Sequence, residues 1–308
     1  MTLLEHCGIL GVDIGGTKTA LVAGTQGGEI LGRIEYPTKP DEGYSQWQSS
    51  FTENLRQLEA ETLAWSPGMA GISVGGPADW VAGVLQAPPN LSTWISVPIR
   101  DDIARVSGLP CKMEHDGRAG ALAEHRWGAG KGLSNIIFLT FGTGIGAGLI
   151  LNGSIYRGAD GAAGEIGHVR LADDGPTAYG KIGSAEAFAS GTGIARLGTH
   201  FFPGTLAGLS AKDIVERAES GDADAVRVLE ISAGKLGQVL ALLADLINPE
   251  MIILGSLASH LPQWYLDEAE SVLRSEALAA NSGCRIAKSA LGSRLQDLAA
   301  IAAALEGL

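Results

Sequence analysis

Cysteine is scarce in this sequence, and the few residues of this type lie far apart. Cys7, Cys111 and Cys284 form no C-x-x-C pair, and an odd number cannot all pair within one chain. This pattern predicts reduced thiols in a cytosolic protein rather than a disulfide framework. No run of about 18 apolar residues occurs, and the N-terminal MTLLEHCGILGVDIGG lacks the regions of a signal peptide. We therefore expect a cytoplasmic protein with no membrane span.

Basic residues are outnumbered by acidic ones. The 308-residue chain has 22 Lys and Arg against 34 Asp and Glu, which gives a formal net charge of −12. A protein that follows a nucleic-acid backbone needs the opposite balance, because its affinity comes from neutralising phosphates. The composition therefore argues against nucleic-acid binding. Any phosphate site must be built locally, from backbone N–H groups, one or two cations and a metal ion.

Glycine, by contrast, is abundant, and many of its 44 residues are clustered. Residues 8–33 and residues 136–158 share one pattern: an apolar run, a Gly-rich turn with Thr, a second apolar run, another Gly turn, and a third strand-like run. Each segment predicts a three-stranded β-meander. Two such segments at equivalent places indicate a duplicated domain.

Apolar periodicity predicts helices around these meanders. Residues three or four apart indicate a helix within 44–58 and a longer one within 226–247, which Asn248-Pro249 ends before an apolar strand. Strands that alternate with helices predict an α/β protein in two lobes. We expect an N-terminal lobe of residues 1–116, closed by a C-terminal helix at 293–308, and a C-terminal lobe of residues 117–292.

Two Gly-rich turns are candidate phosphate sites. In DIGGTK, residues 13–18, exposed N–H groups lie beside a hydroxyl and an ammonium, and Asp13 follows a buried strand. Such a turn can hold phosphate oxygens while the Asp binds Mg²⁺. A plain hairpin turn explains the motif equally well by itself. The second turn, residues 142–146, has the spacing of neither a Rossmann nor a Walker loop, but two such hairpins favour a phosphate clamp.

Three polar side chains are candidates for chemistry on a ligand. Asp116 precedes the helix-like ALAEH, where Asp is a common N-cap. In a functional interpretation, Asp116 is instead a general base for phosphoryl transfer. Spacing alone does not separate the capping role from the catalytic one. Glu165 and His168 lie among small residues in GEIGH. They suit a polyhydroxylated ligand, or are simply surface loop residues.

The motifs DIGGTK, PPNLSTW and HDGRAGALAE and the stretch from Gly142 to His168, in this order, resemble the ROK family of bacterial sugar kinases and sugar-responsive repressors. The resemblance covers nearly the whole chain. It implies a two-lobed actin-like/hexokinase-like fold, a duplicated ribonuclease H-like domain with an interlobe cleft, and a homodimer. It implies a glucokinase- or N-acetylmannosamine kinase-like enzyme that transfers the γ-phosphate of MgATP to a hexose or N-acylhexosamine, with a preference for the 6-hydroxyl. Repressors of this family carry an N-terminal helix-turn-helix domain. We expect the kinase branch here, because the phosphate strand begins by about residue 8.

The resemblance also assigns roles to residues of these motifs. Asp116 would be the catalytic base, and Asp13 would bind Mg²⁺ directly or through water. The ATP phosphates would be held by Gly15, Gly16, Thr17, Lys18, Gly142, Thr143 and Gly144. The adenosine side would be formed by Gly193, Gly255 and Ser256. The sugar would contact Gly75, Gly76, Asn90, His115, Asp116, Glu165, His168 and Glu186.

The zinc motif of the family is missing. Its C-x-C-G-x-x-G-C-x-E pattern follows the EIGH segment, and here Thr177, Tyr179 and Ser184 stand at the cysteine positions. A structural zinc ion needs about four nitrogen or sulfur ligands, and only His168 remains. We therefore expect no structural zinc.

Two further departures concern the ligands. His115 replaces the Asn that usually precedes the catalytic Asp, so we expect a changed sugar preference. The adenosine turn reads Gly255-Ser256-Leu257, a looser match to the family. Two alternatives therefore stay open: a sugar sensor without turnover, and a kinase that uses another phosphoryl donor such as polyphosphate. The presence of both Asp13 and Asp116 favours turnover, and the adenosine-side helix and turn favour ATP.

Overall fold

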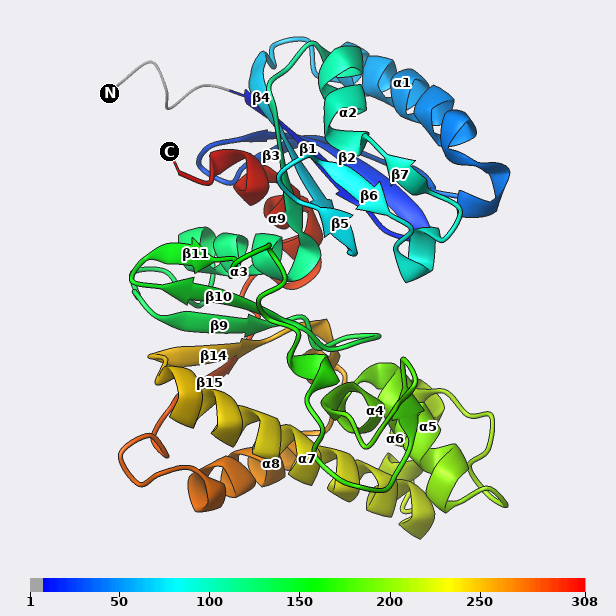
Figure 1. Ribbon diagram of the computed structural model, residues 1–308, viewed down its shortest axis with the longest axis vertical. Helices are drawn as coiled ribbons and strands as arrows, with labels where there is room; N and C mark the ends of the chain where they lie inside the picture. The colour runs from blue at the N-terminus through cyan, green and yellow to red at the C-terminus, as the bar shows by residue number, and fades with distance from the viewer. Residues whose placement is uncertain (1–7, 308) are drawn as a thin grey trace. The chain divides into compact units, whose positions relative to one another are not determined.

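The computed structural model describes residues 8–307 and divides them into two compact units (Figure 1). Within the described residues, unit 1 contains 8–128, 158–161 and 291–307, and unit 2 contains 129–157 and 162–290. The sequence analysis placed the boundary at residue 116. The difference arises because helix α3 (Asp116–Trp127) packs closely against the C-terminal helix α9 (Leu295–Leu305) and so lies in unit 1.

Unit 1 is built on a five-stranded sheet in the order β3-β2-β1-β4-β8. Its strands are β1 (Gly8–Ile14), β2 (Lys18–Thr25), β3 (Ile30–Pro37), β4 (Pro67–Val74) and β8 (Cys111–His115). The first three form an antiparallel meander, and β4 and β8 continue the sheet parallel to β1. The predicted meander is therefore confirmed.

Helices cover this sheet through apolar side chains. Helix α1 (Tyr44–Glu61) buries Trp47, Phe51, Leu55 and Leu58, which is the predicted stripe. Helix α9 lies directly on β4, since a Cβ at Gly71 would approach the Ala300 carbonyl oxygen to 2.1 Å. The other elements of unit 1 are η2 (Pro40–Glu42), β5 (Ala78–Asp79), β6 (Val84–Gln86), η3 (Pro89–Leu91), β7 (Ile95–Val97), α2 (Ile99–Ser107) and η6 (Gly292–Arg294).

Unit 2 repeats the same sheet plan, in the order β11-β10-β9-β14-β15. Its strands are β9 (Ile136–Leu139), β10 (Ala147–Leu151), β11 (Ser154–Tyr156), β14 (Met251–Leu254) and β15 (Arg285–Lys288). An antiparallel meander is again followed by two strands parallel to its first strand. The shared order supports the duplication inferred from the two Gly-rich segments.

Helices of unit 2 pack into a second core. The long helix α7 (Ala223–Ile247) ends at Asn248, which has a left-handed backbone with φ 50°. It packs closely on α8 (Gln263–Glu276), since a Cβ at Gly237 would lie 2.5 Å from the Val272 side chain. The remaining elements are η4 (Ile166–His168), β12 (Thr177–Ala178), β13 (Lys181–Ile182), α4 (Ala185–Ala189), α5 (Gly191–Phe201), α6 (Ala211–Glu219) and η5 (Ser256–Ser259).

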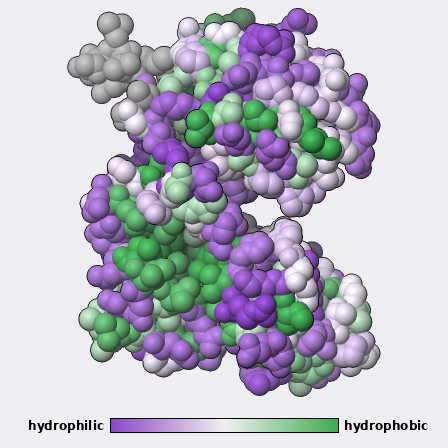
Figure 2. Space-filling model, in the orientation of Figure 1, coloured by the Kyte–Doolittle hydropathy of each residue, from purple (hydrophilic) through white to green (hydrophobic). Residues whose placement is uncertain are grey.

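The surface is mostly hydrophilic on the drawn face of unit 1, and Figure 2 shows a patch of apolar residues on unit 2. Within residues 8–307, no helix is both long enough and apolar enough to cross a membrane.

Candidate functional site

The first set of predicted residues lies in unit 1, where parallel strands end. Strands β1, β4 and β8 run in one direction, so their carboxyl ends share one edge of the sheet. Asp13 lies in register with Ser73 of β4, and Val74 lies in register with His115 of β8. Loops at the carboxyl ends of such strands commonly carry ligand sites. The topology thus brings Asp13 near Asp116, although the two are far apart in sequence.

The carboxyl group of Asp13 is in an unfavourable place for a negative charge. The pKa of Asp13 is raised to about 7, mainly by burial and also by the nearby Asp116 and Asp297. A hydrogen bond with the Ser73 side chain and the charge of Lys18 act in the opposite direction. Repulsion between carboxylates is relieved when a cation lies beside them. This setting therefore suits a hard cation.

Among the described residues, the side chains around Asp13 are too few to surround a metal ion by themselves, and this suits Mg²⁺. No cluster of three or more His, Cys, Asp or Glu side chains suitable for a metal occurs in the described part of the chain. Mg²⁺ commonly keeps several waters and takes one or two carboxylates together with phosphate oxygens. Asp13 therefore suits Mg²⁺ that arrives with a phosphate ligand.

The turn after Asp13 offers backbone N–H groups. Gly15 N–H donates to the Lys18 carbonyl at 3.0 Å. Within residues 8–307, the N–H groups of Gly16 and Thr17 donate no hydrogen bond to protein. A Cβ at Gly16 would lie 2.6 Å from the Cβ of Asn90, so the turn lies directly against Asn90. The turn therefore has free donors for an anion, and only glycine fits at position 16.

The Lys18 side chain pairs with Glu35, whereas the sequence analysis expects it to contact a phosphate. Its ammonium is 2.9 Å from a Glu35 carboxylate oxygen, and Arg33 contacts the same carboxylate at 2.6 Å. These side chains are partly exposed, so the ion pair is weak and open to exchange. The contact of Lys18 with a phosphate stays a prediction.

Asp116 begins helix α3, but His115 occupies the N-cap position. The Gly117 N–H donates to Asp116 Oδ1 at 2.6 Å and to His115 Nδ1 at 3.2 Å. The Asp116 side chain is 55% exposed, and a Cβ at Gly75 would lie 4.0 Å from its Oδ2. Asp116 therefore supports the helix start with one oxygen and leaves the other available to a ligand.

His115 is held from two sides. Its ring meets the ring of Trp80 edge-on, with centroids 5.6 Å apart, and a Cβ at Gly76 would touch both rings. Trp80 also contacts the buried Arg118, whose guanidinium lies 4.7 Å from the ring centroid. His115 Nδ1 lies 3.2 Å from the Gly117 nitrogen and 3.1 Å from Asp116 Oδ1, so this ring nitrogen is engaged at the start of α3 and Nε2 is the nitrogen left for a ligand.

The second set of residues lies in unit 2 at helix η4, whose segment packs beside the start of strand β10. Gly164 has φ 101°, and a Cβ there would lie 1.9 Å from the Ala147 carbonyl oxygen. A Cβ at Gly167 would lie 2.3 Å from the Ile145 carbonyl oxygen. Both glycines therefore let the segment lie on the strand backbone. In consequence Glu165 and His168 are exposed, with a fixed backbone, which sequence spacing alone did not distinguish from a free loop.

Glu186 joins this second set from helix α4. Its side chain is buried, its Oε2 accepts from the Ile145 N–H at 3.4 Å, and a Cβ at Gly144 would lie 2.9 Å from that oxygen. Burial raises the pKa of Glu186, while the Ile145 N–H, Arg196 and His168 lower it. Arg196 was not singled out from sequence. Its Nη1 is buried and has no hydrogen bond within the described residues.

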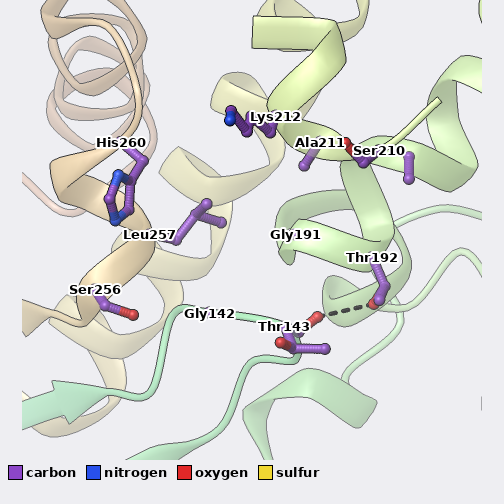
Figure 3. A pocket seen from close by; sticks show the side chains of 11 residues that line it. Gly142, Thr143, Gly191, Thr192, Ser210, Ala211, Lys212, Ser256, Leu257 and His260 are labelled. Carbon is purple, nitrogen blue, oxygen red and sulfur yellow. Dashed lines mark hydrogen bonds between the residues drawn. The ribbon is translucent and has the colours of Figure 1, made fainter.

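A cavity of about 400 Å³ lies within unit 2 (Figure 3). Its lining comes from four segments: Gly142, Thr143, Gly191, Thr192, Ala195, Ser210, Ala211, Lys212, Ser256, Leu257 and His260. The predicted Gly193 and Gly255 do not line it. A Cβ at Gly193 would lie 2.4 Å from the Glu186 carbonyl oxygen, and one at Gly255 would lie 2.9 Å from the Leu139 carbonyl oxygen, so both serve close packing.

The walls of this cavity differ in character. The loop at 142–143 is joined to the start of α5, because Gly191 N–H donates to the Gly142 carbonyl at 2.8 Å and Thr192 Oγ1 donates to the Thr143 carbonyl at 2.8 Å (Figure 3). In the described chain, the N–H of Thr143 donates to no protein atom. Leu257 and His260 form one wall, and Lys212 lies across from them (Figure 3). An apolar side chain beside the free Thr143 N–H and a cation suits a planar group that carries phosphates.

Two lining residues carried no sequence signal. Lys212 and His260 lie on segments that meet the 142–143 loop only through folding. Trp80 was missed for the same reason, although it contacts His115. Ser73 was not singled out either, although it lies two residues before Gly75.

Comparison with known sequences identifies relatives along most of the chain. A model of the ROK family matches residues 9–304. A protein named glucokinase from Halalkalibacterium halodurans is 33% identical over 80% of this chain and 79% of its own. A protein named N-acetylmannosamine kinase from Yersinia pestis is 33% identical over 80% of this chain and 81% of its own.

Comparison with solved structures finds the same fold. A ROK hexokinase from Thermus thermophilus is 30% identical, has a TM-score of 0.87, and is matched over 97% of this chain and 98% of its own. A ROK family glucokinase from Streptomyces griseus, in complex with glucose and AMPPNP, is 28% identical with a TM-score of 0.78 over 97% of this chain and 100% of its own. The expected hexokinase-like, actin-like α/β fold is thereby confirmed.

Proposed function

The chain belongs to the ROK family, and we propose that it is an ATP-dependent kinase that phosphorylates the 6-hydroxyl of a hexose or N-acylhexosamine. The observation that carries the proposal is the exposed carboxylate of Asp116, next to Gly75 at the strand edge that also carries Asp13. Relatives named glucokinase and N-acetylmannosamine kinase support a sugar as the acceptor.

We propose that Asp116 is the general base. The sugar hydroxyl oxygen attacks the γ-phosphorus, the bond from that phosphorus to the bridging oxygen of ADP breaks, and the hydroxyl proton passes to Asp116. A positioned carboxylate performs this step in other phosphotransferases. The oxygen that is not bound to the Gly117 N–H is the one available to take the proton.

We propose that Asp13 holds Mg²⁺, directly or through water. When bound, this ion would neutralise negative charge on the phosphate oxygens. The free N–H groups of Gly16 and Thr17 then donate to phosphate oxygens beside it. A cation beside Asp13 also offsets the repulsion from Asp116 and Asp297.

We propose that the cavity of unit 2 binds the nucleotide. The apolar wall at Leu257 receives the planar base, and Ser256 is positioned to contact the adenosine. The loop from Gly142 to Gly144 donates N–H groups to the phosphates, and Lys212 supplies a cation at the rim. The structure of a relative with AMPPNP supports ATP as the donor.

We propose that sugar hydroxyls contact the residues that the family resemblance assigns to the sugar. In unit 1 these are Gly75, Gly76, Asn90, His115 and Asp116. In unit 2 these are Glu165, His168 and Glu186. Carboxylates, imidazoles and an amide together offer the donors and acceptors that hydroxyl groups require. We further propose a cytoplasmic homodimer, on the basis of the family resemblance and of the free thiols of Cys111 and Cys284; Cys7 lies outside the described residues.

ADP release with a panel of hexoses and N-acylhexosamines tests this function. A kinase releases ADP in step with one or more sugars and requires Mg²⁺. A sugar that binds in calorimetry without ADP release would instead identify a sensor. Phosphorylation with polyphosphate but not ATP would identify the other donor. Both of these outcomes would contradict the proposal.

His115 is expected to set sugar preference. Its Nδ1 is engaged at the start of α3, so the ring offers a ligand only Nε2, whereas Asn offers both a donor and an acceptor. We expect weak activity on glucose and better activity on a sugar that differs at the hydroxyl nearest His115. The His115→Asn variant should shift the ratio of kcat/KM values toward glucose by about 10- to 100-fold, because an unpaired polar group costs about 1–3 kcal/mol.

The ratio of kcat/KM values between sugars serves as its own control. A general loss of folding lowers kcat/KM for all sugars alike and leaves this ratio unchanged. A wild-type kcat/KM on glucose above about 10⁴ M⁻¹s⁻¹, unchanged in His115→Asn, would show that His115 takes no part in selection.

The protein is expected to contain no stoichiometric zinc. Ser184, at a cysteine position of the family motif, instead caps helix α4 by accepting from the Ala187 N–H at 3.3 Å. With three such positions lacking thiolates, too few ligands remain for a structural site. Elemental analysis should find no zinc, and EDTA should leave Tm unchanged. About one tightly held zinc ion per chain would contradict this.

A further inference from the structure

The hairpin formed by β12 and β13 lies where the family has its zinc motif. Its two-residue turn is Tyr179-Gly180, with φ 46° and φ 73°. Turns with two left-handed residues favour Asn-Gly and tolerate bulky side chains poorly. A tyrosine at the first position is therefore unfavourable for the turn itself, and a contact outside the turn must favour it.

That contact is with His168. The rings of Tyr179 and His168 are stacked, with centroids 5.7 Å apart and planes at 22°. Within residues 8–307, neither ring nitrogen of His168 makes a hydrogen bond to protein. The stack is thus the contact that orients the imidazole, and it leaves both ring nitrogens available to a ligand.

Hydrogen bonds join the hairpin to residues 168–171, next to this stack. Lys181 Nζ donates to the His168 carbonyl at 2.5 Å, and Arg170 donates to the Ile182 carbonyl at 2.8 Å. The Leu171 N–H donates to the Gly183 carbonyl at 2.7 Å. These bonds place Tyr179 over His168 without a metal ion.

Charged residues that we propose as sugar contacts, Glu165 and Glu186, lie near Tyr179. Burial raises the pKa of Tyr179, and Glu186 and Glu165 raise it further, while Arg196 lowers it. The phenol is therefore neutral at physiological pH and lies near the same carboxylates that the proposed sugar would contact.

We propose that Tyr179 is a positioning residue that holds the imidazole of His168 in the orientation that binds sugar, in place of the zinc ion of relatives. This inference rests on the proposed function, since it assumes that His168 contacts the sugar. Tyr179 itself acts only through His168. Planar stacking restricts the ring of His168, and a ring that is already ordered loses less entropy when it binds a ligand.

The Tyr179→Asn variant separates positioning from folding. Asn-Gly is the favoured sequence for this turn, so Tm should be equal to or above that of the wild type. Loss of the ring should raise the KM for sugar about tenfold, as for other supporting groups behind a ligand contact, with kcat changed less than about twofold. Tyr179→Phe keeps the ring and should retain the wild-type KM.

A second readout does not depend on activity. In histidine-labelled full-length protein, the His168 ring signals are assigned by their loss in His168→Asn. Stacking shifts these signals, so Tyr179→Asn should move them and Tyr179→Phe should not. The exposed Tyr156, on β11, gives a matched control, and Tyr156→Asn should change neither these signals nor the KM.

The outcomes distinguish this inference from the proposed function. A wild type without phosphotransfer to any sugar overturns the proposed function. If the wild type is active, a normal KM in Tyr179→Asn overturns the positioning role. Equal damage in Tyr179→Phe and Tyr179→Asn overturns it as well, because the hydroxyl rather than the ring would then be responsible.

Discussion

The Asp116→Asn variant is expected to lose phosphotransfer by about 10² to 10⁴ in kcat, the usual worth of a general base. Asn has the same shape, and its amide oxygen still accepts from the Gly117 N–H that now bonds Asp116 at 2.6 Å. Helix α3 should therefore begin as before. Sugar affinity, measured by calorimetry, should change little.

The matched control is Asp101→Asn, which neutralises another exposed aspartate in the first turn of a helix, α2. It should leave kcat and Tm unchanged. Wild-type kcat in Asp116→Asn, with the best sugar, would show that Asp116 serves only the helix start and that the mechanism is wrong.

The Asp13→Asn variant is expected to lose activity and gain stability at once. Removal of the carboxylate removes the proposed Mg²⁺ ligand, so kcat should fall by about 10² to 10³, as for other electrostatic groups at a reacting phosphate. The same substitution removes a charge from a buried position. Thermal unfolding at pH 8 should therefore show a higher Tm than the wild type.

The pH dependence of this effect follows from the pKa of Asp13. The pKa in the fold is about 7, above the ordinary value of 3.8, so the fold favours the protonated carboxyl. The contribution of protonated Asp13 to the free energy of unfolding is fully present below pH 3.8 and is lost as the pH rises through 7. The stability advantage of the Asp13→Asn variant over the wild type should thus grow between these values, to at most about 4 kcal/mol at pH 8.

Mg²⁺ should reverse the order of stability if Asp13 holds the ion. Binding needs the carboxylate, so the Mg²⁺ concentration required for activity should rise as the pH falls below 7. Asp101→Asn again serves as the control and should show no such trend. Equal stability of Asp13→Asn and wild type from pH 5 to pH 8 would contradict the burial of this charge.

Local pattern in the sequence was sufficient to predict the elements that surround the site. Both meanders, helix α1 and the end of α7 at Asn248 follow from periodicity and from turn residues, which depend on neighbours a few positions away. The start of α3 at Asp116 follows in the same way. The ROK resemblance then suggested which of these residues face ligands.

Only the tertiary structure decided the environment of these residues. The pKa of Asp13 depends first on its burial and then on Asp116 and Asp297, which approach it because β1, β8 and α9 pack together. The stack of Tyr179 on His168 depends on a hairpin with an unfavourable turn residue, which sequence propensity argues against.

The cavity of unit 2 shows the same division between local and long-range information. Gly142 and Thr143 were recognisable in sequence, because a Gly-rich turn is a local signal. Lys212 and His260 became part of the lining only when their segments folded against that turn. Sequence by itself therefore determined the elements, the duplication and the family of this protein. Tertiary packing decided charge, burial and ring orientation, because these depend on contacts between residues that are distant in the chain.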